Sequence, residues 1–305
     1  MPRERLTSPQ IVRRLLVSEG IRPRRAFGQN FLVDANILRI ITGAAGLRSS
    51  DTVIEVGPGL GALTQALVEQ VRHVYAIEFD PTMVKILEKE FTGADRLVLV
   101  HADALAFDLA SFREGSPPER VKMVSNLPYQ IAATLVVKWL IKYPWLSEYT
   151  VMVQREVADR IAANPGSKEY SAASVKIQYR AKVERVAGVS RNSFYPRPGV
   201  DSAVLHLERL ADGGERDIPL ACDEPFFDQV VTSAFSQRRK KLANSVAAGV
   251  PGVDRDSVVD ALHAMGRHEA VRAEELSQVE FTELSNYLLA LTRASEGVLP
   301  TKQRT

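Results

Sequence analysis

A strand, a glycine-rich turn and a helix follow one another over residues 51–71, and this succession limits the fold more than any other feature of the chain. The apolar run in Asp51–Val56 is typical of a buried strand, and apolar residues recur at helical spacing at Leu63, Leu67 and Val71. The turn between them reads Gly57-Pro58-Gly59-Leu60-Gly61. Glycines after a first strand let the backbone approach a ligand closely and point the amides of the next helix at it. The segment therefore predicts a ligand-binding α/β unit.

This turn departs from the fingerprint of dinucleotide-binding folds. The fingerprint is G-x-G-x-x-G, whereas here the third glycine, Gly61, comes one residue early and Glu55 lies within the end of the strand. The departure argues against NAD. It suits a cofactor that has no pyrophosphate and carries a cationic amino-acid end, namely S-adenosylmethionine.

Acidic residues follow the next two predicted strands. The strand Val74–Glu78 ends in an acid 21 positions after Gly57, close to the spacing of about 20 expected for a carboxylate that binds ribose hydroxyls. The strand Leu97–Val100 is followed by Asp103, which is placed to accept a hydrogen bond from the adenine amino group of a cofactor. For Asp103 alone, a helix cap is the alternative interpretation.

The fourth predicted strand, Val121–Ser125, runs into Asn126-Leu127-Pro128-Tyr129. This turn suits alkylation of an exocyclic amine, which is a poor nucleophile while it is conjugated to a ring. The Asn126 carboxamide and the backbone carbonyl of Leu127 or Pro128 are acceptors for the amine hydrogens, and Pro128 stiffens the turn. Tyr129 offers a stacking face for a flipped-out base. An ordinary strand-to-helix turn is the alternative, and the preceding strands favour the active site.

These features predict a fold with two domains. Carboxyl ends of parallel strands meet at one edge of an open α/β sheet, where such folds bind ligands. The sequence also predicts a fifth strand at Glu148–Gln154, a helix at Tyr170–Tyr179 and closing strands at Val183–Val189 and Ser202–Leu210. A linker follows the last strand, and the pattern after the linker is helical. We expect a doubly wound, Rossmann-like α/β methyltransferase domain at residues 1–210, with a basic helix and lid at 1–45. A smaller all-helical domain at 217–305 follows.

Charge and cysteine content bear on partners and compartment. The net charge is only +2, but Arg238-Arg239-Lys240-Lys241 and the first 25 residues are locally basic, the latter through Arg3, Arg5, Arg13, Arg14, Arg22, Arg24 and Arg25. Such clusters are also common on solvated faces. Cys222 has no intramolecular partner, which fits a reducing compartment. No stretch is apolar for long enough to span a bilayer, and the five histidines lack metal-ligand spacing. We expect a cytoplasmic protein, monomeric, with no membrane or metal partner.

Four segments carry a resemblance to a known family. They are Phe27–Leu32, Glu55–Gly61, Asn126–Tyr129 and the segment Phe194–Val204, which reads FYPRPGVDSAV. They resemble the ribosomal RNA adenine dimethyltransferases, in the family's order and over nearly the whole chain. The resemblance is strongest to the bacterial small-subunit branch, which methylates two adjacent adenosines near the 3′ end of 16S rRNA within a small-subunit particle. The stretches Ala234–Leu242 and Arg272–Ser277 also resemble the C-terminal domain of this family, which implies that the helical domain at 217–305 binds the RNA substrate.

The resemblance implies roles for particular residues. Cofactor contacts would fall on Asn30, Leu32, Gly57, Gly59, Glu78, Asp103, Ala104 and Asn126. Phe194 would stack on the target adenine opposite Tyr129; a loop anchor packed against the domain is the alternative. The chain has Gln130-Ile131-Ala132-Ala133 where many members have Asn-Ile-Ser, which makes the loop after the Asn126 turn less certain.

Two alternatives of different kinds stay open at this point. The first is the related large-subunit adenine N6-methyltransferase of the macrolide-resistance type, which the chain length and the helical C-terminal motifs disfavour. The second is an RNA-binding assembly factor, or a mitochondrial transcription factor of the same fold, with methylation incidental. Glu78 together with an intact Asn126 turn favours retained catalysis.

Overall fold

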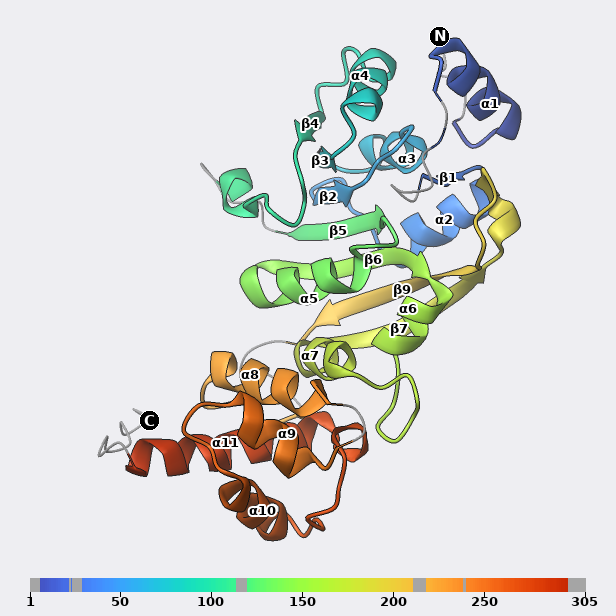
Figure 1. The fold of residues 1–305 in the computed structure, drawn as a ribbon. Helices are drawn as coiled ribbons and strands as arrows, with labels where there is room; N and C mark the ends of the chain where they lie inside the picture. The colour runs from blue at the N-terminus through green and yellow to red at the C-terminus, as the bar shows by residue number, and fades with distance from the viewer. Residues whose placement is uncertain are drawn as a thin grey trace. The chain divides into compact units, whose positions relative to one another are not determined.

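The computed structural model describes residues 6–21, 23, 29–113, 120–210, 218–237 and 240–295. The chain divides into two compact units, which Figure 1 shows in one view. The first unit comprises residues 1–159 and 182–209, and the second comprises residues 160–181 and 210–305. Each unit is described below by itself.

A seven-stranded sheet forms the centre of the first unit, within the part of the chain that the structure describes. The strands lie in the order β4-β3-β2-β5-β6-β9-β7. Pairing is parallel from β4 through β6, and β9 runs antiparallel to β6. The strands are β2 (Thr52–Val56), β3 (His73–Glu78), β4 (Leu97–His101), β5 (Val121–Asn126), β6 (Leu146–Gln154), β7 (Ala181–Val189) and β9 (Ser202–Arg209).

Strand order reverses between β2 and β5, which are neighbours although β3 and β4 lie between them in the sequence. Open α/β sheets bind ligands at such a switch point, outside the carboxyl ends of the strands. The predicted glycine turn follows β2, and the predicted Asn126 turn follows β5. The topology therefore brings the two turns to the same place.

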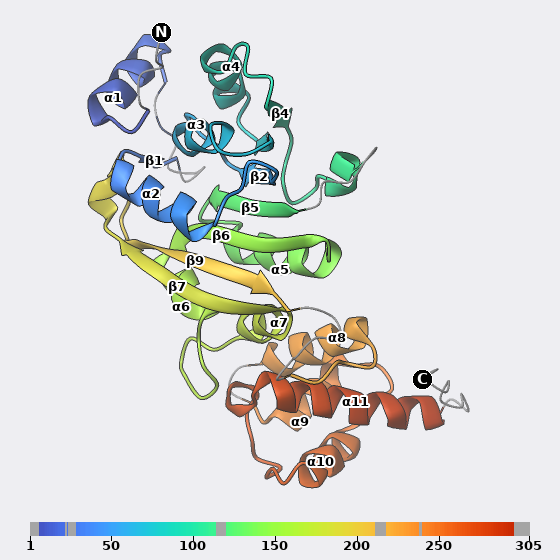
Figure 2. The same ribbon diagram turned by 180° about the vertical axis from the view of Figure 1, so that it is seen from behind.

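Helices cover both faces of the sheet, which confirms the predicted doubly wound fold. Figures 1 and 2 show α2 and α5 on opposite faces. Alternate residues of the strands pack on α2 and α3 in one apolar cluster that includes Val53, Val74, Val124 and Val204. The helices of this unit are α1 (Pro9–Ser18), α2 (Ala35–Ala44), α3 (Ala62–Val68), α4 (Pro81–Glu90), α5 (Ala132–Lys142) and α6 (Arg155–Ile161), with short 3₁₀ helices η2 (Leu109–Arg113) and η3 (Arg191–Ser193).

A second, two-stranded sheet joins parts of the chain that are far apart in sequence. Strand β1 (Phe31–Leu32) pairs antiparallel with β8 (Phe194–Tyr195), so that Leu32 lies opposite Phe194. The connection continues where Val33 N donates to Ser193 O (2.8 Å) and Ser193 Oγ donates to Asp34 Oδ2 (2.8 Å). The sequence analysis predicted neither strand, because two-residue strands leave no periodic pattern.

The second unit is a helical assembly with its own apolar core. Its helices are α7 (Ala172–Arg180), α8 (Glu224–Phe235), α9 (Leu242–Gly249), α10 (Arg255–Ala264) and α11 (Gln278–Ser295), with the 3₁₀ helix η4 (Ala273–Glu275). Buried Tyr179, Phe227 and Phe281 belong to its core cluster. Helix α7 lies in this unit, although the sequence boundary at residue 210 would assign it to the first domain.

Buried charge fixes α7 to α8. The Arg180 guanidinium is 4% exposed and donates to both carboxylate oxygens of Asp228, at 3.1 and 2.9 Å, and to Glu224 Oε2 at 2.9 Å. Two charged groups withdrawn from water need such mutual pairing. None of the described helices is long and apolar enough to cross a membrane.

Candidate active site

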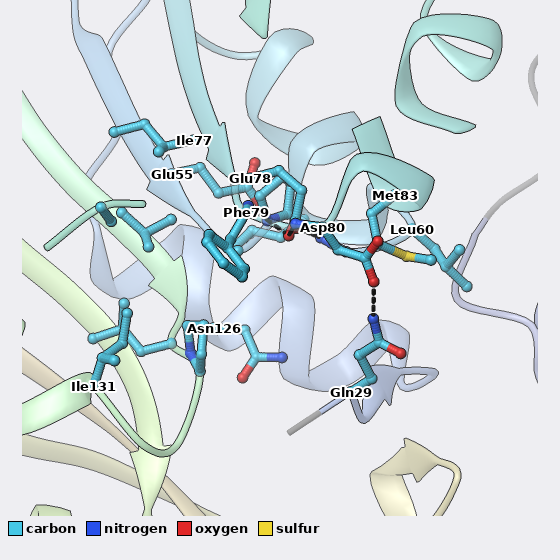
Figure 3. Close-up of a pocket in the computed structure, with 18 of the residues that line it drawn as sticks. Gln29, Glu55, Leu60, Ile77, Glu78, Phe79, Asp80, Met83, Asn126 and Ile131 are labelled. Carbon is cyan, nitrogen blue, oxygen red and sulfur yellow. Dashed lines mark hydrogen bonds between the residues drawn. The ribbon is translucent and has the colours of Figure 1, made fainter. Parts of the chain in front are cut away.

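A cavity of about 310 Å³ lies in the first unit, at the edge where β2, β3 and β5 end. Figure 3 shows Glu55, Glu78 and Asn126 from these strand ends, together with Gln29, around it. Its lining includes Asn30, Leu32, Gly57, Gly59, Glu78, Asp103, Ala104, Asn126, Leu127, Pro128 and Tyr129. All the residues predicted from the sequence to bind the cofactor or to act on the base, except Phe194, therefore line one cavity.

The turn after β2 has a backbone that glycine permits. Gly57 and Gly61 have φ angles of +69° and +89°, which side chains rarely tolerate. A Cβ on Gly61 would lie 2.5 Å from the ring of Phe91, and one on Gly57 would lie 3.0 Å from Cγ of Pro128. The turn is thus pressed between α4 and the Asn126 turn, and its Gly57, Gly59 and Gly61 amides donate to Ile77 O, Glu78 Oε2 and Pro58 O.

Backbone amides hold the carboxylate of Glu78. Its Oε1 accepts from Phe79 N and Asp80 N, both at 2.8 Å, and its Oε2 accepts from Gly59 N at 3.2 Å. Burial raises the pKa of Glu78, and the three amides oppose that rise because they favour the charged form. The bonds fix the direction of a carboxylate that is well suited to a ribose diol.

Glu55 is a second acid of the cavity, and the sequence analysis gave it no role. Its side chain is 1% exposed, and Thr64 Oγ1 donates to its Oε2 at 2.7 Å. Burial, with a smaller contribution from the nearby Glu78, raises the pKa of Glu55 to about 8. Glu55 is therefore mainly protonated at neutral pH.

The ionisable residues of the cavity are all acids. Glu55, Glu78, Asp80 and Asp103 line it, and no lysine, arginine or histidine occurs among the described lining residues. The charged side chains here would repel a pyrophosphate, whereas they favour a cationic ligand. The lining therefore fits the sequence argument against a dinucleotide.

Asp103 both stabilises a local turn and lines the cavity, the two alternatives considered for it from the sequence. Its Oδ1 accepts from Leu105 N at 2.8 Å, and its backbone oxygen accepts from Ala106 N and Phe107 N, so the residue stabilises a local turn. It also lines the cavity with Ala104. The turn fixes the aspartate at the end of β4 without removing it from the cavity.

The Asn126 turn is held at its start and end by backbone bonds. Leu127 N donates to Met152 O of β6 at 3.0 Å, and Ile131 N donates to Pro128 O at 3.2 Å. Figure 3 shows the carboxamide of Asn126 pointing into the cavity. The Tyr129 ring is half-buried, and its hydroxyl lies 3.1 Å from Ser202 Oγ, with either group as donor.

Phe194 lies apart from this group. It is 4% exposed and packs in the cluster that contains Leu32, Val189 and Val204, because β8 pairs with β1. The structure does not bring its ring to the cavity lining. Its present packing is that of a loop anchor, the alternative weighed from the sequence.

Two cavity features were missed from the sequence. Gln29 Nε2 donates to Asp80 Oδ2 at 2.7 Å and so connects two walls of the cavity, as Figure 3 shows. Phe79 is 59% exposed beside Glu78. Gln29 belongs to the Phe27–Leu32 motif, and Asp80 precedes a proline as a helix cap, but no sequence signal pairs them. Phe27 and Gly28 lie outside the described residues.

The reversed strand order and a cavity with glycine, acid and amide residues at successive strand ends define a Rossmann-like methyltransferase. The sequence profile described as "Ribosomal RNA adenine dimethylase" matches residues 20–288. The chain belongs to this family, as the sequence motifs predicted.

Individual relatives agree with this placement. A protein of Geobacillus thermodenitrificans named "Ribosomal RNA small subunit methyltransferase A" is 37% identical over 293 residues, which cover 94% of this chain and 98% of that protein. The crystal structure of a dimethyladenosine transferase from Plasmodium falciparum is 25% identical with a TM-score of 0.67, covering 88% of this chain and 98% of that one. The structure of the 23S rRNA methyltransferase ErmE is 28% identical with a TM-score of 0.63, covering 85% and 99%.

Proposed function

We propose that this protein transfers methyl groups from S-adenosylmethionine to N6 of two adjacent adenosines near the 3′ end of 16S rRNA, giving N6,N6-dimethyladenosine. Several curated relatives that carry the small-subunit name are 37–41% identical over 90–94% of the chain, which supports this substrate. The 23S enzyme is less similar, at 28% identity. The large-subunit reaction is therefore the second candidate.

The acid-lined cavity at the switch point is the observation that carries the proposal. S-adenosylmethionine has no pyrophosphate, and it has a sulfonium and an ammonium that the acids Glu78, Asp80 and Asp103 favour electrostatically. Glu78 is held for the ribose hydroxyls, Asp103 for the adenine amino group, and the Gly57–Gly61 backbone allows close approach. Asn30, Leu32, Gly59, Ala104 and Asn126 complete the cofactor contacts we propose.

The sulfonium supplies an activated methyl group, so the protein needs to position the amine and raise its nucleophilicity. Asn126 and the carbonyl of Leu127 or Pro128 are the acceptors that would hold the N6 hydrogens out of the ring plane, so that the nitrogen lone pair is no longer conjugated. They would also stabilise the positive charge that develops on nitrogen as its bond to the methyl group forms and the sulfur–methyl bond breaks, and one N6 proton leaves after the transfer. Tyr129 would stack on the base, and positioning then accounts for most of the rate. No nucleophilic side chain is required.

We propose Phe194 as the second stacking face. Its ring is buried beside Leu32, so engaging a base requires the ring to leave that cluster. Leu32 is itself a proposed cofactor contact that pairs with Phe194 through β1 and β8. Movement of the ring would therefore shift Leu32, which lies on the cofactor side of the cavity.

Recognition of RNA needs a larger surface than one base pocket. We propose that a small-subunit particle is gripped by the C-terminal unit, through the Arg238–Lys241 cluster, and by the basic N-terminal segment. Lys240, Lys241, Arg13 and Arg14 are exposed, whereas Arg238, Arg239, Arg3, Arg5, Arg22, Arg24 and Arg25 lie outside the described residues. Such a substrate and the free, exposed Cys222 fit a monomer that works in the cytoplasm.

Methyl transfer from labelled S-adenosylmethionine to unmethylated ribosomal subunits tests this proposal. We expect label in small subunits and none in large subunits. Label confined to large subunits would favour the second candidate. Binding to small subunits without any label would favour an assembly factor.

A further inference from the structure

We propose that Ser202 is a positioning residue that holds the Tyr129 ring in place for the target base. The inference rests on the proposed function, because it assigns Ser202 an effect on base methylation. The Ser202 hydroxyl lies 3.1 Å from the Tyr129 hydroxyl. Ser202 is not among the cavity-lining residues, so any effect on the reaction acts through Tyr129.

The sheet topology places Ser202 beside the Asn126 turn. Strand β9 is antiparallel to β6, and Ser202 at its start pairs with Gln154 at the end of β6. Strand β6 is parallel to β5, with Met152 opposite Asn126. The start of β9 therefore reaches the same sheet edge as the end of β5, although residues 129 and 202 are 73 positions apart.

The backbone around Ser202 leaves its hydroxyl little freedom. The side chain is 1% exposed. The preceding residue, Asp201, accepts from Arg155 N through its backbone oxygen and from Arg191 N through Oδ1, both at 3.0 Å. The ladder between β6 and β9 holds the residues that follow. The position of Ser202 is thus fixed by its neighbours, so that its hydroxyl can orient the Tyr129 side chain.

Tyr129 is the side chain that needs such a point. Pro128 stiffens the backbone before it, but the half-buried ring still turns about two side-chain torsions. Stacking on a base requires the ring to lie at a set place, and a hydrogen bond at the far end of the ring holds its long axis, from Cβ to the hydroxyl, in one direction. Burial raises the pKa of Tyr129, so the phenol keeps the proton that this bond can use.

A phenylalanine at position 129 would offer the same stacking face without the anchor. The tyrosine hydroxyl therefore acts through its hydrogen bond to Ser202. Removing either hydroxyl should abolish the same contribution to methylation. Two residues that act through one hydrogen bond give non-additive losses, whereas two independent structural effects multiply.

The test is a double-mutant cycle on methylation of unmethylated small subunits at saturating cofactor. We expect Ser202→Ala and Tyr129→Phe each to lower kcat about 3- to 10-fold, the effect of one neutral hydrogen bond. The double variant should be no slower than the slower single variant. The dissociation constant for S-adenosylmethionine should stay at its parent value.

Thr150→Val is the matched control. The Thr150 hydroxyl is also buried in the β6–β9 pair and bonds across it to His206 Nδ1 at 3.0 Å, but it lies away from the cavity lining. This variant should keep the parent kcat. A parent-like kcat for Ser202→Ala, or single losses that multiply in the double variant, would overturn the positioning role.

A second readout does not depend on methyl transfer. In protein labelled at tyrosine, Ser202→Ala should shift or broaden the Tyr129 ring resonances in NMR spectra, whereas Thr150→Val should not. Unchanged Tyr129 resonances in Ser202→Ala would overturn the inference even if the parent protein methylated no RNA. A parent protein with no activity on small subunits, together with a shifted Tyr129 ring, would contradict the proposed function and leave the anchor established.

Discussion

Gly57 and Pro128 lie so close together that a Cβ atom on Gly57 would be 3.0 Å from Cγ of Pro128. Gly57 begins the turn after β2, and Pro128 stiffens the turn after β5. The turn proposed to bind the cofactor and the turn proposed to act on the amine are therefore in contact at the switch point of the sheet. A change at one should disturb the other.

Gly57→Ala should reduce both cofactor affinity and turnover, by about tenfold or more. An alanine would be strained in a backbone with a φ of +69°, and its methyl group would press against Pro128. Gly93→Ala is the control, because Gly93 has a similar φ of +75° but nothing within 4 Å of an added Cβ. Calorimetric titration and single-turnover rates measure the two effects. Equal losses in the two variants would show that strain, and not the contact with Pro128, is responsible.

Glu78→Ala should weaken S-adenosylmethionine binding by roughly tenfold or more, since a charge-assisted hydrogen bond is worth about 1.5–3 kcal/mol. Glu88→Ala, on the exposed side of α4, should bind like the parent protein. Isothermal calorimetry measures both variants. An unchanged affinity in Glu78→Ala would remove Glu78 from the ribose site.

Glu55 should make the free energy of unfolding depend on pH. Its folded-state pKa of about 8 lies above the ordinary value of 4.5, so between these values the folded state keeps a proton that the unfolded state releases. The stability that Glu55 contributes is full below about pH 4.5 and is lost as pH rises through 8.

Glu55→Gln keeps a neutral side chain that can still bond to Thr64, so it should gain stability relative to the parent protein as pH rises from 5 to 8. Urea unfolding at several pH values measures the difference. A difference that does not vary with pH would mean that Glu55 has an ordinary pKa in the folded state.

Neutralising Arg238, Arg239, Lys240 and Lys241 should weaken binding to small subunits and lower the salt dependence of that binding. The slope of log K against log salt should fall by about 0.7 to 0.9 for each phosphate that the variant no longer neutralises. Lys241 lies 3.2 Å from Glu269, which also pairs with Arg255, so part of its charge is already balanced. We therefore expect Lys241 to contribute less than Lys240 when each is changed singly.

Cofactor affinity should stay unchanged in the quadruple variant, because Lys240 and Lys241, the two of these residues that the structure describes, do not line the cavity. Salt titrations of particle binding supply the slope. A slope equal to that of the parent protein would make the cluster a solvated surface.

The strand-end residues could be predicted from sequence because topology alone decides where they meet. Once β2, β3 and β5 are parallel neighbours, Gly57, Glu78 and Asn126 must reach one edge of the sheet. Side-chain identity at that edge then indicates the chemistry. This explains why the fold and the cavity lining agree with the sequence analysis.

Features made by long-range contacts could not be predicted in this way. Phe194 is buried because a two-residue strand pairs with residues 31–32, more than 160 positions earlier, and no local pattern announces that pairing. Helix α7 lies in the second unit, where Tyr179 joins the apolar core and Arg180 pairs with Asp228 on α8. Linear spacing carries no information about either partner.

Nucleotide-resolution mapping of methylated adenosine in 16S rRNA, after incubation of unmethylated small subunits with the protein and S-adenosylmethionine, tests the central claim most directly. We predict N6,N6-dimethyladenosine at two adjacent positions near the 3′ end. Asn126→Ala should lower its formation by about 10²-fold or more, because the variant has no side-chain acceptor for the developing charge. Absence of dimethyladenosine with the parent protein, or an Asn126→Ala variant as fast as the parent, would contradict the account.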